Sequence, residues 1–429
     1  MFHLRRPVLL ATLALGLCSG TVQGAPDTLT TDVSDVSNSD VANPDSLRGS
    51  FETAPPVFNV PTPQPSAPPS KTDLSVGLRG SYVRDRDGTH LETIIAPAIS
   101  MTRQGRRSSL DFDADAELIK RSDDEWRVGA LRLTAARGYA LDQWTAASGT
   151  AELEYSQPGR SDLGVESNVA VPASSISGAL GGEVVRKSGH FIFTTSGSAG
   201  RTTYGQTTLL DGTTEDNTAS NVTALAGRLR VGFELTPKLT LFTEAGRTYD
   251  YYDAPSEALG YKLDGTTDVL RAGASARLGH FVTAEGSVGV GLRRYTLTDL
   301  PEVKSNLYSA EVTYQPDETF SLTAAYDTTL GAPEADSVGT ARIERAASGE
   351  ARYTVNSWLA LRASANWSSA ETVGSADEKD DRSGVGVGAD YTINSHAALT
   401  ADYSFMRATI SPDPTENIHR ITLGLLLSN

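Results

Sequence analysis

The sequence predicts an all-β protein, an antiparallel transmembrane β-barrel of about 18 strands, with 16 as the alternative count. Three observations predict it. From residue 73 onward, apolar and polar side chains alternate with a period of two over stretches of about 10 to 14 residues. The turns between these stretches recur roughly every 40 residues. After the N-terminal segment there is no apolar run of about 18 residues, so a membrane crossing would have to use strands rather than helices.

Residues 1–24 have the features of a targeting segment. Arg5 and Arg6 precede an apolar run from Val8 to Leu17, and small residues then lead to an expected cleavage site after Gly24. The only cysteine lies inside this segment, so the mature chain is expected to have no disulfide and no lipid anchor. Loss of the two arginines moves the net charge from −16 to −18, which argues against nucleic acid as a partner.

Residues 25–72 are expected to be a disordered periplasmic linker. The stretch "VSDVSNSDVANPDS" is polar and acidic, and "APPVFNVPTPQPSAPPS" is rich in proline. Such a composition buries too little apolar area to offset the entropy of ordering. Within it, residues 51–70 carry a small apolar group around Phe58, which is the alternative to a plain spacer: a docking segment for periplasmic or export-complex proteins.

The barrel is expected to occupy residues 73–429. Short turns such as "RKSGHF", "ELTPKL" and "TINSHA" each join two alternating stretches, and longer polar loops follow. Counted along the chain, the expected strands begin near Leu74, Leu91, Ser108, Trp126, Trp144, Ser174, Phe191, Val222, Leu239, Val269, Phe281, Leu307, Phe320, Arg342, Leu359, Val385, Ala398 and His419.

Two further features favour a membrane barrel over a soluble sandwich. Short turns at one end of each hairpin and long acidic loops at the other are typical of outer-membrane barrels. Aromatic residues such as Trp126, Tyr249 and Trp358 fall near expected strand ends, where amphipathic rings favour the membrane interface. Pro97 predicts a bulge or an unpaired position in the second strand.

Four stretches carry a resemblance to a known family: "RLRVGFELTPKLTLFTEAGRTYDYYD", "DVLRAGASARLGHFVTAEGSVGVGLRRYTL", "VGVGADYTINSHAALTADYSFMRATIS" and "ENIHRITLGLLL". They resemble outer-membrane β-barrel proteins of proteobacteria that are often called beta-barrel porin 2. The resemblance covers roughly residues 72–429 and implies a porin-like barrel. Some members accompany exopolysaccharide synthesis and export genes, so it also implies exported polysaccharide as a candidate solute.

The stretch "LDFDADAELI" places a carboxylate at every second position from Asp111 to Glu117. A calcium loop that begins D-x-D-x-D needs Gly at its sixth position and Glu at its twelfth, where this chain has Ala116 and Ser122. Alternate residues of a strand also lie about 6 to 7 Å apart along one face, too far to converge on one ion. We therefore expect no metal and no cofactor.

An outer-membrane enzyme is the second interpretation. Its histidine would lie near the outer rim, which leaves His90 and His419, because His190, His280 and His396 fall in short turns. Neither candidate lies in a catalytic motif. The sequence therefore assigns no catalytic residue and predicts a protein that is not an enzyme.

The third interpretation is a lumen wall. If Phe112, Ala114 and Leu118 face lipid, the alternating carboxylates must face the lumen, because a charge on the lipid face is costly. The expected acidic lumen residues are Asp111, Asp113, Asp115, Glu117, Glu152, Glu154 and Glu285, and the expected basic ones are Arg228, Arg230, Arg271, Arg277 and Arg293. Arg247 and Arg345 fall on the lipid face, which predicts either an interfacial position or a bulge.

The lumen charges are expected to form opposed walls, an acidic one on strands 3 to 5 and a largely basic one on strands 8 to 11, which would orient polar solutes. The favoured function is a channel for polar solutes or exported polysaccharide. The alternatives are a non-conducting docking barrel of an envelope export system and an outer-membrane enzyme. Expected partners are outer-membrane lipid, lipopolysaccharide and the barrel assembly machinery.

Overall fold

The computed structural model describes residues 70–429, except 123, 257, 297–299, 334–336, 338, 376–377 and 412–414. The expected targeting segment and nearly all of the expected linker, residues 1–69, lie outside the described residues. Within the described part, no helix is long and apolar enough to cross a membrane.

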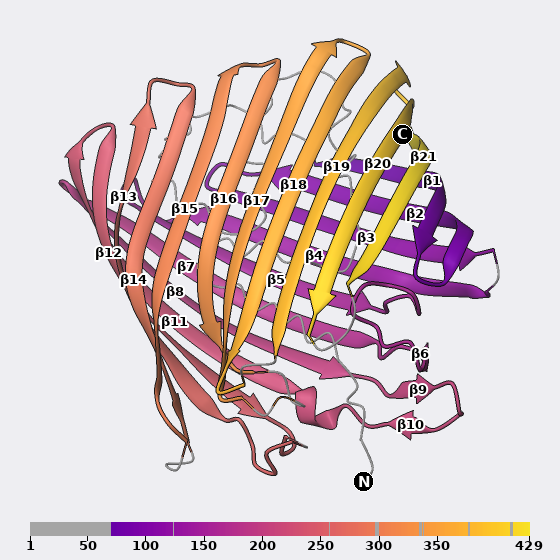
Figure 1. Cartoon of the computed structure of the whole chain (residues 1–429). Helices are drawn as coiled ribbons and strands as arrows, with labels where there is room; N and C mark the ends of the chain where they lie inside the picture. Colours follow the sequence, from indigo (N-terminus) through magenta and orange to yellow (C-terminus); the bar gives the residue numbers. More distant parts are fainter. Residues whose placement is uncertain are drawn as a thin grey trace.

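Eighteen antiparallel strands form one closed sheet, as the sequence predicts (Figure 1). They are β1 (Lys71–Asp85), β2 (Gly88–Gln104), β3 (Ser108–Arg121), β4 (Trp126–Ala140), β5 (Thr145–Ser156), β7 (Ser175–Ser188), β8 (Phe191–Tyr204), β11 (Val222–Thr236), β12 (Leu239–Tyr252), β13 (Gly265–Leu278), β14 (Val282–Tyr295), β15 (Val303–Asp317), β16 (Phe320–Gly331), β17 (Ala341–Asn356), β18 (Leu359–Val373), β19 (Lys379–Asn394), β20 (Ala397–Ile410) and β21 (Glu416–Ser428).

The barrel closes where the last strand pairs with the first. β21 runs antiparallel to β1 from the pair Ser75 and Ser428 to the pair Arg84 and His419. Closure leaves the sheet without an exposed edge, which is what a strand protein needs in lipid. The count of 18 rather than 16 follows from this continuous pairing.

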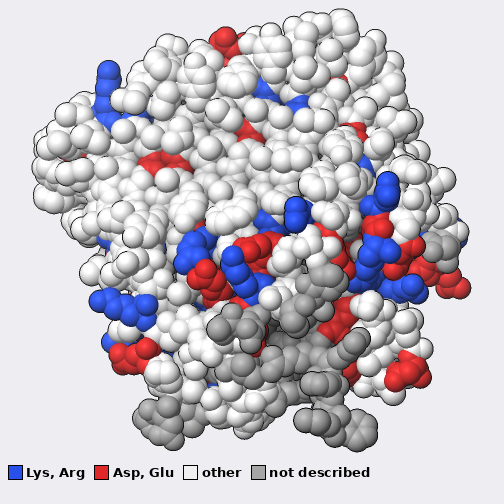
Figure 2. Space-filling model, in the orientation of Figure 1, with Lys and Arg blue, Asp and Glu red and all other residues white. Residues whose placement is uncertain are grey.

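The period of two separates an inward from an outward face. On β1, Ser81 and Val83 are 1% and 2% exposed, whereas Leu78 and Tyr82 are 43% and 49% exposed. The outward face carries large apolar side chains on nearly every strand. Figure 2 shows the upper part of one side of the barrel as mostly uncharged surface with scattered charged residues, whereas Lys, Arg, Asp and Glu gather densely lower down. An outward apolar band of this kind matches a lipid-facing surface.

The two rims differ in their connections. At the turn rim, the upper end of the front strands in Figure 1, connections such as 189–190, 237–238 and 395–396 hold two residues. At the loop rim, the opposite end, the connections include 157–174, 205–221 and 253–264. The expectation of long loops throughout this rim is wrong at two places. Only Arg86 and Asp87 join β1 to β2, and residues 122–125 join β3 to β4, no more than residues 141–144 at the turn rim.

Side-chain oxygens close several turns of the turn rim. Oδ1 of Asn356 accepts hydrogen bonds from the backbone N–H of Trp358 and Leu359, and Oδ1 of Asn394 accepts one from His396. In these Asx-type turns, the side-chain oxygen closes the turn by accepting from the backbone that follows. The backbone N–H of Trp144 likewise bonds Asp142 and holds the pKa of that carboxyl below its usual range.

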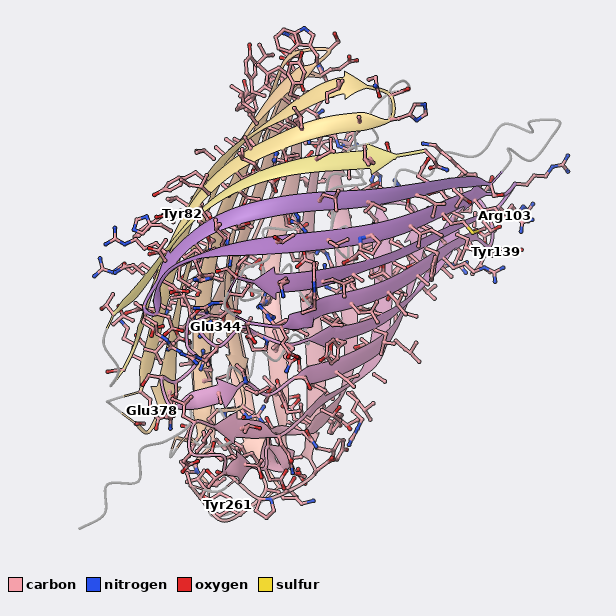
Figure 3. The ribbon with its side chains drawn as sticks, turned by 90° about the vertical axis from the view of Figure 1, so that its right-hand side faces the viewer. Tyr82, Arg103, Tyr139, Tyr261, Glu344 and Glu378 are labelled. Atoms are coloured by element: carbon pink, nitrogen blue, oxygen red, sulfur yellow. The ribbon has the colours of Figure 1, made fainter. Side chains whose placement is uncertain are left out.

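Aromatic rings gather at the turn rim on the outward face. Phe281 contacts Tyr314 and Tyr314 contacts Phe320, with ring centroids 6.4 and 6.1 Å apart, and Trp358 contacts Tyr391 at 5.3 Å. The rings form part of an interfacial girdle, as their positions in the sequence predict. Figure 3 separates Arg103 and Tyr139 at this rim from Tyr261 and Glu378 at the loop rim.

Local irregularities interrupt the ladder at several places, and two of them involve β3. The pairing of β2 with β3 runs from Glu92 to Ile95 and resumes at Ala98, so Pro97 is unpaired on that side, in agreement with the prediction. The register of β3 with β4 shifts between Glu117 and Leu118. A shift of this type lets the strand bend without moving its inward residues to the lipid face.

A small second sheet lies at the loop rim. It consists of β6 (Val169–Val171), β9 (Thr207–Leu209) and β10 (Thr214–Glu215), in the order β10, β9, β6. The strands come from two different loops, so the pairing of Val169 with Leu209 ties the 157–174 loop to the 205–221 loop. A short 3-10 helix, η3 (Thr218–Ser220), leads back to β11.

Candidate functional site

The acidic ladder of β3 lies on the inward face. Asp111, Asp113 and Asp115 stand opposite Thr102, Ser100 and Ala98 of β2, which share the face of the buried Ile94. Between them, Phe112 and Ala114 point outward. Glu117, at the end of the ladder nearest the loop rim, is 3% exposed and accepts a hydrogen bond of 2.5 Å from Nη2 of Arg79 on β1.

Glu152 and Glu154 of β5 share the inward face with the ladder. They stand opposite Thr134 and Arg132 of β4, and Nη2 of Arg132 donates to Oε1 of Glu154 at 3.3 Å. Arg132 was not among the expected lumen residues. Its position could have been found, because it alternates with Leu131 and Leu133 in the same period that places the acids.

Arg228 of β11 lies on the inward face and is buried. Its guanidinium donates to Glu183 of β7 and to Glu244 of β12, each at 3.4 Å, and to the hydroxyl of Ser196 at 3.2 Å. One cation is therefore shared between two carboxylates that approach it from opposite sides.

Arg230, two residues further along β11, reaches across two strands. Its Nη1 and Nη2 donate to the two carboxylate oxygens of Glu285 on β14 at 2.8 and 2.7 Å. On the way, the guanidinium stacks over the ring of Phe242 at 3.5 Å from the centroid. A bidentate pair with a stacked guanidinium is among the stronger ion-pair geometries.

Glycine makes room for this arrangement. A Cβ at Gly273 of β13 would lie 2.5 Å from Cζ of Phe242 and would also collide with the backbone oxygen of Gly286. The missing side chain lets the Phe242 ring lie flat against the wall, and Arg230 lies on top of it. Gly289 serves Arg271 in the same way, because its Cβ would lie 2.6 Å from Cγ of Arg271.

The remaining expected arginines occupy three different settings. Arg271 donates to Asp327 of β16 and to the backbone oxygen of Thr328, both at 3.2 Å. Arg293 is fully buried and donates to Asp250 at 2.6 Å. Arg277 lies near the turn rim, where it is exposed, away from the settings of Arg271 and Arg293.

A second inward cluster, formed by Arg362, Asp390 and Asp402, was not among the expected lumen residues. Nη2 of Arg362 on β18 donates to Asp390 of β19 at 2.8 Å and to Asp402 of β20 at 2.9 Å. It too lies over a glycine, since a Cβ at Gly388 would lie 3.2 Å from Nη2 of Arg362. Alternation alone could have placed all three charges inside.

These pairs revise the expected basic wall. Arg228, Arg230, Arg271 and Arg293 each have a carboxylate from a strand no more than three positions away in the sheet. The sector is therefore close to neutral, whereas the β3 to β5 sector keeps an excess of carboxylates. The charges are arranged as flat local pairs along the wall rather than as two opposed surfaces.

Arg247 and Arg345 lie on the outward face near the loop rim. Arg247 pairs with Asp268 and is half exposed, and Arg345 pairs with Glu371 at 3.2 Å. Their strands continue in register past both residues. Of the two expected alternatives, the interfacial position is therefore correct and the bulge is not.

The 157–174 loop folds into the barrel mouth. Leu163 is 6% exposed and packs on three inward residues from distant strands: Val83 of β1, Ala408 of β20 and Ile418 of β21. The loop leaves β5 and returns to β7, so this contact carries it over the inward face to the closing strands of the barrel. The contact could not be predicted from the sequence, because polar loop composition gives no sign of a partner across the lumen.

Arg86, in the two-residue turn between β1 and β2, holds this loop. Its guanidinium donates to the backbone oxygens of Arg160, Val165 and Glu166, with a distance of 2.6 Å to Arg160. It also pairs with Glu416 at 2.9 Å. Three carbonyl contacts from one side chain fix the loop at the rim.

Two further apolar clusters line the mouth. Leu263, in the 253–264 loop, is 1% exposed and packs on Val222 and Tyr252. On the next sector, Leu307 of β15 packs with Leu330 of β16, next to Val303 and Ala341. The mouth at the loop rim thus has apolar contacts on three sides. The lumen that it leads into is lined by paired charges.

The histidines considered for catalysis have other surroundings. His90 is buried between Asp85 and Glu92, at 3.6 and 3.3 Å. His419 faces outward, where Nδ1 lies 3.1 Å from the hydroxyl of Tyr403. Among the described residues, no group of three or more His, Cys, Asp or Glu is placed to hold a metal ion.

The closed sheet, the outward apolar band and the charged lumen define an outer-membrane β-barrel of porin type. A family model described as "Putative beta-barrel porin 2" matches residues 81–427. The chain therefore belongs to this family. The match confirms the resemblance seen in the sequence.

Solved barrels give more distant similarities. OccK3 (OpdO) of Pseudomonas aeruginosa is 11% identical with a TM-score of 0.40, over 83% of this chain and 95% of that one. OccAB3 of Acinetobacter baumannii is 9% identical with a TM-score of 0.41, over 84% and 99%. The FrpB iron transporter of Neisseria meningitidis is 10% identical with a TM-score of 0.43, over 79% and 62%. No curated protein sequence matches the chain.

Proposed function

We propose that the protein is a passive channel for polar solutes. The observation that carries this proposal is the course of the inward arginines. Arg362 lies over Gly388, and Arg230 lies over the Phe242 ring next to Gly273. Each bonds a carboxylate on a nearby strand, Arg230 with Glu285 and Arg362 with Asp402. Side chains held in this way line a pore instead of bridging it.

Barrel size supports the same proposal. Opposite walls of an 18-stranded barrel are nine strands apart, whereas the inward ion pairs of the described residues join strands no more than three positions apart. Barrels of 16 to 18 strands typically enclose an aqueous channel. Hydroxyl and carboxylate side chains on the inner wall suit polar solutes, and an exported polysaccharide is one solute class that the proposal includes.

Conductance in a planar bilayer tests the channel directly. The chain refolded into detergent and added to the bilayer is expected to give discrete, reproducible current steps. A folded barrel that inserts without any step, with and without residues 25–72, would overturn the proposal. The targeting segment is part of the proposal too, and N-terminal sequencing of exported protein should begin at Ala25.

A second candidate function is a non-conducting docking barrel. The apolar contacts at the mouth favour it, because Leu163 and Leu263 are buried inside the loop rim and tie two loops to the wall. In this case the protein would bind a periplasmic export component through residues 51–70. Capture of such a component by the full chain, and its loss on deletion of residues 51–70, together with silent bilayers, would select this candidate.

A further inference from the structure

One outward patch near the loop rim carries two arginines that have no ion-pair partner among the described residues. We call it the Arg84 patch: Arg84 on β1, His419 on β21, and Phe405 and Arg407 on β20. His419 stands directly opposite Arg84 on one side and Phe405 on the other, and Arg407 is two residues further along β20. The residues therefore share one outward surface across three adjacent strands, at the seam where the barrel closes.

Aromatic side chains form the floor of the patch. The rings of Phe405 and His419 lie 4.8 Å apart between centroids, and the hydroxyl of Tyr403 lies 3.1 Å from Nδ1 of His419. Tyr82, on the same face of β1, is 49% exposed and stands near the end of β1 away from Arg103 (Figure 3). Rings of this type lie at the level of lipid headgroups.

The charge of the patch differs from that of its neighbours. Outward arginines elsewhere near this rim have carboxylate partners: Arg201 has Asp253, Arg247 and Arg294 share Asp268, and Arg345 has Glu371. In the described part of the chain, Arg84 and Arg407 form neither ion pairs nor side-chain hydrogen bonds, and both are exposed. Their strands are separated by one strand, about 10 Å, so the two guanidinium groups can serve one anionic headgroup.

Between the patch and the turn rim, the same outward face is apolar. Ile421 and Leu423 of β21 are 50% and 65% exposed, and Leu78 of β1 is 43% exposed. A cationic site at the loop rim, next to an apolar strip on the same outward face, fits an amphiphile with an anionic head and acyl chains. The loop rim of an outer-membrane barrel faces the cell exterior, where the lipid of the outer leaflet is lipopolysaccharide.

We propose that the Arg84 patch binds the phosphate groups of lipopolysaccharide, with acyl chains against Leu78, Ile421 and Leu423. Arg84 and Arg407 supply the charge-assisted hydrogen bonds, and His419 lies between them. The site is on the outside of the barrel, so it does not depend on whether the lumen conducts.

The test uses the full chain refolded in detergent and lipid A that carries both phosphates, with binding measured by native mass spectrometry. The double variant Arg84→Ala with Arg407→Ala should lose affinity about ten- to thirtyfold, since each basic residue near an anionic surface contributes about 1 kcal/mol. The matched control is Arg247→Ala with Arg294→Ala, which removes two outward arginines that already have carboxylate partners. It should bind as the wild type does.

Two further binding measurements test the role of the phosphates and of the positive charge. Wild-type protein should bind dephosphorylated lipid A as weakly as the double variant binds the phosphorylated form, and Arg84→Lys with Arg407→Lys should keep most of the affinity. A difference in gel migration between unheated and boiled samples verifies that each variant has folded. Equal binding by the double variant and the wild type, or equal binding of inorganic phosphate and lipid A, would refute the site.

Discussion

Arg230 on β11 and Glu285 on β14 form a bidentate ion pair at 2.7 and 2.8 Å across two intervening strands. The guanidinium of Arg230 stacks on the Phe242 ring, and the absence of a side chain at Gly273 leaves room for that ring. The inward charges of this sector lie along the wall in ion pairs, so the sector has little net charge.

Breaking this pair should change ion selectivity. Glu285→Gln leaves the Arg230 guanidinium without its carboxylate, so the reversal potential in a salt gradient should move towards anion selectivity. Arg230→Gln should move it in the opposite direction, because Glu285 then faces the lumen alone. The double variant, which removes both charges, should return close to the wild type. Shifts of the same sign in both single variants would contradict this account.

The packing of Phe242 against Gly273, next to the ion pair, predicts an effect on stability. Gly273→Val places a branched side chain where the Phe242 ring and the backbone of Gly286 lie, which should cost about 1 to 3 kcal/mol. Gly227→Val is the matched control, because a Cβ at the outward-facing Gly227 meets nothing within 4 Å. Urea unfolding in lipid vesicles, followed by tryptophan fluorescence, measures both. An equal midpoint for the two variants would mean that the packing over Gly273 does not matter.

Strand parity predicts opposite outcomes for neighbouring residues. Ala114→Asp puts a carboxylate on the lipid face of β3 and should lower the folded fraction in vesicles. The cost in free energy of folding should be smaller than the roughly 2 to 4 kcal/mol for an arginine in the middle of the membrane. Asp113→Asn changes an inward residue and should fold normally, while Asp113→Asn with Asp115→Asn should reduce cation preference. If Asp113→Asn fails to fold and Ala114→Asp succeeds, the inward assignment of the ladder is wrong.

The loop at the mouth predicts a change in pore size. Arg86→Ala removes the contacts with the backbone oxygens of Arg160, Val165 and Glu166, so the 157–174 loop should detach more readily and single-channel conductance should rise. Leu163→Ala should act in the same direction, because it removes a buried side chain from the contact with Val83 and Ile418. Arg137→Ala, on the outward face, serves as a control and should leave the conductance unchanged.

Much of the fold could be predicted from the sequence because strand alternation is a local signal. The strand count, the short turns at one rim and the inward position of Asp111, Glu152 and Arg271 all follow from a period of two. The outward positions of Arg247 and Arg345 follow from it as well. Hydrogen-bonded registers then keep neighbouring strands in phase, so one correctly assigned strand fixes the faces of the next.

The partners of these residues could not be predicted. Arg132 and Arg362 were overlooked although their parity was readable, but the choice of Glu285 for Arg230 or of Asp402 for Arg362 depends on side chains from strands that are not neighbours. The curvature of the wall brings such residues together, and curvature has no local sequence signal. The same holds for the 157–174 loop, whose polar composition gives no sign that Leu163 packs against residues of the mouth.

The sequence by itself determined a membrane barrel of about 18 strands and the set of side chains that face its lumen, because the period of two and the spacing of turns are properties of single strands and hairpins. Only the tertiary structure decided that the expected basic wall is close to neutral, that glycines leave room for the arginines, and that loops narrow the mouth. These features arise from contacts between residues far apart in the chain, such as Leu163 with Val83, which form only when the sheet closes.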